Sequence, residues 1–165
     1  MWLSDRRSLL AGLAALPLAA ACGFRPAYGP GGGAARLRGA VRPDDPENRA
    51  DFAFVAALEE RLGRSDVAPY ALSYDIDISG RGVARERGMG DTRRQLAGTV
   101  DIALTDRASG ATLTEGRAEA FVGYSTTSTQ LATAIAEDDG RDRLMRILAD
   151  RVATLLIAAA DDLAR

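Results

Sequence analysis

Hydrophobic residues recur along the chain with two different periods, one typical of helices and one typical of strands. Between residues 45 and 63 the spacing is three and four, which predicts an amphipathic helix. Asp45 is its expected N-cap, Pro46 its first helical residue and Gly63 its C-terminal stop. The face that this helix buries is formed by Phe54, Val55, Leu58 and Leu62.

From residue 70 to 79 the period changes to two, and segments 96–106 and 111–125 repeat that alternation, with a turn at 106–110. Strict alternation predicts strands with one buried face and one wet face. The expected buried positions are Tyr70, Leu72, Tyr74, Ile76 and Ile78 in the first strand, Leu96, Gly98, Val100, Ile102 and Leu104 in the second, and Ala118, Ala120 and Val122 in the third.

The helical period returns from about Ser128 to Leu163, where Gly140 leaves open a kink or a break. Residues 36–41 alternate weakly and predict a short first strand. The whole order predicts one α+β domain over residues 36–165. We expect a two-layer sandwich, in which a small, mostly antiparallel (mixed) sheet of three to four strands carries two helices on one face.

Composition narrows the chemistry that this domain can perform. The chain of 165 residues has no His and one Cys, which excludes His-based triads, His-ligated zinc and an internal disulfide. Asp/Glu, Ser/Thr and Arg side chains remain for catalysis, so an enzyme is possible but poorly equipped, and we expect no enzyme activity, cofactor or metal. The formal net charge of −2 argues against nucleic-acid binding. Every basic residue is Arg. Two explanations are open: the base composition of the genome, or selection for side chains that bind phosphate and carboxylate.

Residues 1–21 read as an export signal peptide, with Arg6 and Arg7 before an apolar stretch that is too short to span a membrane. A signal that ends on Cys22 resembles the lipobox of bacterial lipoproteins. That resemblance implies cleavage before Cys22 and acylation there, with palmitate among the chains. Residues 22–35 would then be a lipidated N-terminus and flexible tether. The alternative is an ordinary secreted protein with a free Cys. The export route, general secretory or twin-arginine, also stays open.

The residues after the cysteine carry a more specific resemblance. Cys22-Gly23-Phe24-Arg25-Pro26-Ala27-Tyr28-Gly29, with the later step Tyr124-Ser125-Thr126-Thr127-Ser128 into an Ala-rich helix, is similar to the alphaproteobacterial form of the lipopolysaccharide-assembly lipoprotein family LptE. The resemblance implies an outer-membrane protein, lipid-anchored at the periplasmic face. Its members plug the LptD β-barrel, bind lipopolysaccharide and help to insert it into the outer leaflet.

Lipopolysaccharide carries phosphate and carboxylate groups, for which Arg side chains are suitable contacts. A Gly-rich segment between two predicted strands holds five of them, and we expect a mobile, anion-binding hairpin tip there. The alternative is an ordinary solvated loop. The candidate lipopolysaccharide-binding residues are Arg81, Arg85, Arg87, Arg93 and Arg94.

Two other classes of function stay open beside this one. Asp75, Asp77 and Asp101 could pair for hydrolysis or hold calcium, although a solvated strand face accounts for them more simply. The chain could also be a different periplasm-facing lipid-binding or transport-auxiliary lipoprotein. A carboxylate-dependent hydrolase is the least favoured of the three.

Overall fold

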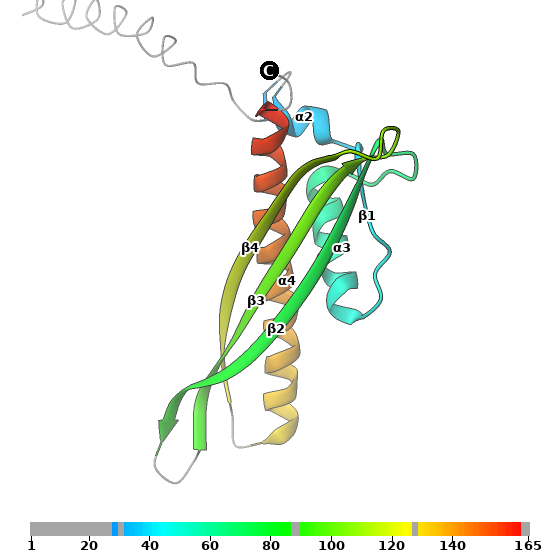
Figure 1. The fold of residues 1–165 in the computed structure, drawn as a ribbon. Coiled ribbons are helices and arrows are strands. Elements are labelled where there is room, and N and C mark those ends of the chain that lie inside the picture. Colours follow the sequence, from blue (N-terminus) through cyan, green and yellow to red (C-terminus); the bar gives the residue numbers. More distant parts are fainter. Residues whose placement is uncertain (1–27, 30–31, 87–89, 127–128, 163–165) are drawn as a thin grey trace, which may run out of the picture.

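The structure is a computed structural model that describes residues 28–29, 32–86, 90–126 and 129–162 (Figure 1). Over these residues a four-stranded sheet is covered by helices on one face. The elements in chain order are α2 (Gly33–Leu37), β1 (Val41–Pro43), α3 (Arg49–Leu62), β2 (Tyr70–Glu86), β3 (Gly90–Asp106), β4 (Thr112–Ser125) and α4 (Gln130–Asp162).

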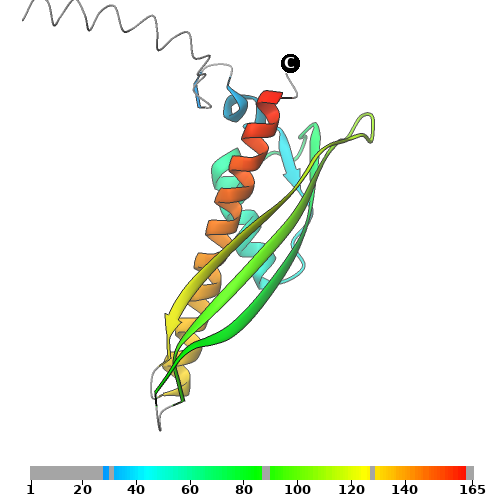
Figure 2. The same ribbon diagram turned by 60° about the vertical axis from the view of Figure 1, so that its left-hand side comes forward.

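The sheet has the strand order β1-β2-β3-β4 and is mixed. The short β1 pairs in parallel with the start of β2, at Val41 and Tyr70. The other neighbours pair antiparallel along long strands. Figures 1 and 2 show α3 and α4 side by side on the same face of this sheet. The predicted fold class, an α+β sandwich of two layers, is confirmed.

The core lies between the sheet and the two long helices, where the predicted alternation decides which side chains are buried. The inward positions of β3 and β4 are buried as expected, and the inward residues of β2 are buried or pack against the core. Phe54 of α3 packs on Tyr74 of β2 with ring centroids 5.2 Å apart. The largest fully buried side chains are Phe54, Leu58, Leu72, Leu104, Leu144, Met145, Leu148, Leu156, Val100 and Val152.

The predicted start of the first long helix is wrong by three residues, whereas its C-terminal stop at Gly63 is confirmed. Helix α3 begins at Arg49 with Asn48 as its N-cap. The Asn48 side chain accepts bonds from the backbone amides of Ala50 and Asp51. The Asp51 carboxylate in turn accepts from the Asn48 side-chain amide at 2.8 Å. This reciprocal cap satisfies the free amides of the first turn, so Asp45 and Pro46 stay in the preceding loop.

The short first strand predicted at residues 36–41 lies further along the chain, at Val41–Pro43. Residues 33–37 form the short helix α2 instead, with Leu37 buried against the core. Arg36 donates to the carbonyl oxygen of Ala160 at 3.0 Å, which ties α2 to the end of α4. Gly39 then turns the chain with a φ of +67°, and β1 starts at Val41. The predicted boundary between tether and domain, at residues 35 and 36, falls inside α2.

Helix α4 is continuous through Gly140, so the glycine does not break the helix. Gly140 is buried against the sheet near Leu96 and Tyr124. The first turns of α4 extend past the start of α3 (Figure 1). Leu131 and Ile135, which lie in these first turns, are exposed. No helix in the described part of the chain is long and apolar enough to cross a membrane.

Candidate functional site

The segment that carries the five candidate arginines is mostly strand rather than loop. Strands β2 and β3 continue their pairing as far as Glu86 and Gly90, with an irregular register between Gly82 and Arg85. The predicted loop is therefore shorter than expected, because pairing between β2 and β3 takes up most of the segment. Cys22, Arg87 and the side chain of Arg85 lie outside the described part of the structure.

Arg81 and Arg93 lie on the face of the sheet that points away from the helices. The Nε of Arg81 donates to the Gln95 side-chain oxygen at 3.0 Å across the β2–β3 pair. Leu96 points into the core, so its neighbour Gln95 points outward, and Arg93 two residues earlier shares that face. Both arginine side chains are exposed.

Phe121 adds an apolar group to the same outer face. Its ring is 68% exposed on β4 and the residue pairs with Ala97 of β3, one side-chain repeat from Gln95. We call Arg81, Arg93, Gln95 and Phe121 the distal patch. Cations and an exposed aromatic side chain on one face suit a molecule that carries both an anionic group and an apolar part.

Arg94 points the other way, into the space between the hairpin and α4. It is half-buried and interacts with the hydroxyl of Tyr124 and with Glu137. The Tyr124 hydroxyl donates to Glu137 at 3.1 Å, and Arg141 donates to the same carboxylate at 2.7 Å. Arg94 therefore helps to hold the hairpin on α4 and does not face a ligand on the outer face.

This network shifts the titration of its members. Burial and the neighbouring Glu137 raise the pKa of Tyr124, which keeps the phenol protonated. The hydrogen bond from Arg141 lowers the pKa of Glu137, so that the carboxylate stays charged. Sequence reasoning grouped Arg94 with Arg93 because they are adjacent, although adjacent residues of a strand point to opposite faces.

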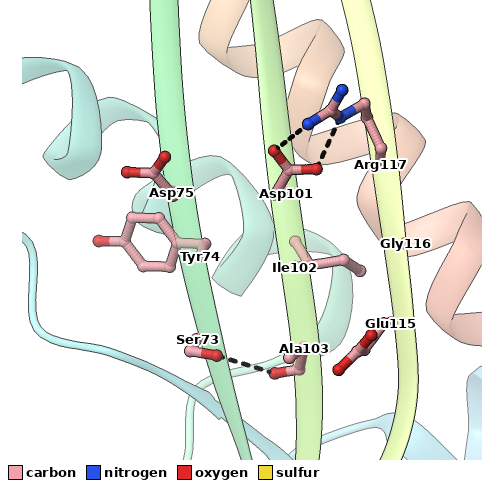
Figure 3. A pocket seen from close by; sticks show the side chains of 9 residues that line it. All are labelled: Ser73, Tyr74, Asp75, Asp101, Ile102, Ala103, Glu115, Gly116 and Arg117. Atoms are coloured by element: carbon pink, nitrogen blue, oxygen red, sulfur yellow. Dashed lines mark hydrogen bonds and ion pairs between the residues drawn. The ribbon is translucent and has the colours of Figure 1, made fainter.

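Two of the candidate carboxylates, Asp75 and Asp101, lie nearer the middle of the outer face and line an open hollow of about 620 Å³ (Figure 3). Asp77, the third candidate, does not line it. Arg117 donates to both oxygens of Asp101 at 2.6 Å, and this pairing lowers the pKa of Asp101. Asp75 is its neighbour across β2 and β3. An ionised carboxylate on an exposed face is a poor proton donor for catalysis. The described residues hold no cluster of three metal-binding side chains.

Comparison with known proteins places the fold. No family model matches the sequence, and no curated protein matches it significantly. Among solved structures, a candidate lipoprotein from Caulobacter crescentus CB15 aligns over 78% of this chain and 96% of its own, with a TM-score of 0.66 and 22% identity. The fold is that of a solved bacterial lipoprotein.

Two further structures agree with this result. Rare lipoprotein B from Shewanella oneidensis covers 76% of this chain and 98% of its own, at a TM-score of 0.59 and 13% identity. A minor lipoprotein from Acinetobacter baumannii covers 72% and 88%, at a TM-score of 0.54 and 13% identity. At such identities the likeness establishes the shared fold.

Proposed function

We propose that this chain is a lipoprotein of the LptE kind, which acts as plug and assembly partner of the LptD β-barrel during lipopolysaccharide transport. The observation that carries the proposal is the fold shared with rare lipoprotein B, itself an LptE protein. The Cys-Gly-Phe-x-Pro-x-Tyr-Gly opening at Cys22 supports the same family independently of the fold. The proposal includes export by residues 1–21 and an outer-membrane anchor at Cys22 that faces the periplasm.

The shape of the domain suits a plug that spans a barrel. The described N-terminal helix α2 and the end of α4 lie at one end of the molecule, and the β2–β3 hairpin extends to the other (Figures 1 and 2). At about 3.3 Å per residue, the 17 residues of β2 cover roughly 55 Å. A membrane with its headgroups is about 40–45 Å thick. A domain anchored near α2 and seated in a barrel would therefore reach across the membrane with the end of its hairpin. Arg81 of the distal patch, eleven residues or about 36 Å along β2 from Tyr70, would be carried most of the way.

In this proposal the distal patch is where lipopolysaccharide binds. Arg81 and Arg93 would contact phosphate or carboxylate groups, and Phe121 would contact an acyl chain or the apolar face of a sugar. Arg85 and Arg87 stay candidates because they belong to the same end of the hairpin. Arg94 is assigned to holding the hairpin in place, since its side chain interacts with Tyr124 and Glu137.

No catalytic role is proposed. The solved structures that share this fold are named as lipoproteins, and Asp101 on the outer face is held by Arg117. The second candidate, a different periplasm-facing lipid-binding or transport-auxiliary lipoprotein, has the same fold support but requires no barrel.

The deciding experiment is isolation of the full-length protein in mild detergent from its own membranes, followed by depletion in the cell. We expect a large barrel protein to co-purify in about equal amount, and surface lipopolysaccharide to fall on depletion. A Cys22→Ala variant, which cannot be acylated, should leave the outer-membrane fraction. Recovery of the protein alone, with normal surface lipopolysaccharide after depletion, would reject the barrel partnership and favour the second candidate.

A further inference from the structure

Strand β4 forms a long open edge of the sheet. It runs for 14 residues, and within the described part of the chain only β3 pairs with it. An edge strand leaves a row of backbone N–H and C=O groups without ladder partners, and such a row is a template for another strand. Most globular domains cover or shorten an edge of this length. The surface beside β4 therefore decides which kind of strand can pair with it.

Helix α4 forms a ledge beside this open edge. It runs alongside β4 (Figures 1 and 2). A helix is about 10–12 Å wide, whereas strands are about 4.8 Å apart, so a helix packed beneath an edge strand extends beyond it by roughly one strand. A hollow of about 420 Å³ lies in this position. We define the β4 ledge by four of the residues that line this hollow, which are Ala118, Ile147, Arg151 and Leu155.

We propose that the β4 ledge binds an extended segment of a partner protein, which adds to the sheet as a fifth strand beside β4. Ile147 and Leu155 are eight helical residues apart, which is about 12 Å. Side chains on one face of a strand repeat every 6.6 Å or so. The first and third inward side chains of an added strand would therefore meet Ile147 and Leu155. Leu155 is 41% exposed in the structure, and the added strand would cover it.

The outer face of β4 specifies the charge of that segment. Glu115 and Glu119 are exposed four residues apart, while Arg117 between them is already paired with Asp101. Basic residues four apart on the outward side of the partner segment would lie opposite these carboxylates. A second copy of β4 offers mainly carboxylates there, which disfavours self-pairing. The occupant is therefore an alternating segment, apolar inward and basic outward.

Arg151 controls access to the edge. Its guanidinium donates to the backbone oxygen of Glu119, a group on β4. A charged side chain that reaches over an edge strand is a common protection against unwanted pairing. An incoming strand has to displace this contact, so removal of the Arg151 side chain should strengthen binding. The inference goes beyond the proposed function, because it requires neither lipopolysaccharide nor the lipid anchor.

The test uses the full-length protein in mild detergent and a nine-residue fluorescent peptide with Val at even positions, Arg at the third and seventh, and Thr elsewhere. Binding is measured by fluorescence anisotropy. Two control peptides carry N-methyl groups on either the even or the odd residues, so that each loses the hydrogen bonds of one edge. We expect one control to lose binding and the other to keep it, because only one edge of the peptide faces β4.

Variants of the protein complete the test. Leu155→Glu should weaken peptide binding about tenfold or more by placing a charge on the ledge, whereas Leu131→Glu, the same change at an exposed site elsewhere on α4, should not. Arg151→Ala should strengthen binding. Equal loss with both methylated peptides, or equal effects of Leu155→Glu and Leu131→Glu, would overturn the proposal. So would a dimer, seen by light scattering, that Leu155→Glu dissociates.

Discussion

Gly98 is required by the close approach of α4 to the sheet. A β-carbon added there would lie 3.0 Å from a methyl group of Leu144 and 3.1 Å from one of Leu148. We expect Gly98→Val to lower the free energy of unfolding by about 1–3 kcal/mol through overpacking. Gly123→Val is the matched control, because that exposed strand position has its nearest atom at 3.9 Å. Urea denaturation measures both, and equal stability of the two variants would contradict the packing argument.

Glu137 should make the stability of the domain depend on pH. Its pKa is lowered in the folded state by Arg141, with Tyr124 and Arg94 also nearby. A lowered carboxyl pKa stabilises the fold above the ordinary value of about 4.3, and this stability is lost as the pH falls through the lowered pKa. Glu137→Gln should therefore lose less stability than the parent between pH 7 and pH 3.

The control for this pH prediction is Glu60→Gln on the exposed side of α3, which should keep the parent's pH dependence. Denaturant unfolding at the two pH values gives the comparison. An unchanged pH dependence in Glu137→Gln would mean that the network around Tyr124 contributes little to folding.

At the scale of the element, a substitution at Gly140 tests whether α4 needs a glycine at this position. A β-carbon there would lie 3.5 Å from Leu96 and 3.7 Å from Tyr124, which is ordinary contact. Since Ala is favoured over Gly inside a helix, Gly140→Ala should raise the free energy of unfolding by about 0.5–1 kcal/mol. Gly110→Ala should do the opposite because Gly110 has a φ of +73°. A loss of stability in Gly140→Ala would indicate that the helix needs the glycine.

At the scale of the whole molecule, the proposed function places lipopolysaccharide binding at the distal patch. Arg81→Glu combined with Arg93→Glu should weaken binding of purified lipopolysaccharide about tenfold or more, because two charge-assisted contacts become repulsive. Arg64→Glu combined with Arg146→Glu makes the same change of charge at exposed sites outside the patch. Equal weakening by both double variants, measured by surface plasmon resonance, would assign the effect to net charge rather than to the patch.

The sequence by itself determined the layers of this protein. Period-two alternation predicted β3, β4 and the first part of β2 with the correct buried faces, because one side of each strand must be apolar to pack on the helices. Gly63 marked the end of α3, because the backbone there has a φ of +80°, which favours glycine. The lack of His and of a second Cys excluded His-based catalysis and an internal disulfide, because no fold can supply a side chain that is absent from the sequence.

Only the tertiary structure decided the details that depend on contacts distant in sequence. Residues 33–37 became a helix because Leu37 and Arg36 meet the core and the end of α4. Arg93 and Arg94, identical in sequence terms, were separated by the pleat of β3 into an exposed and a half-buried position. Periodicity describes which face a residue takes within its own element, whereas its partners are set by packing between elements.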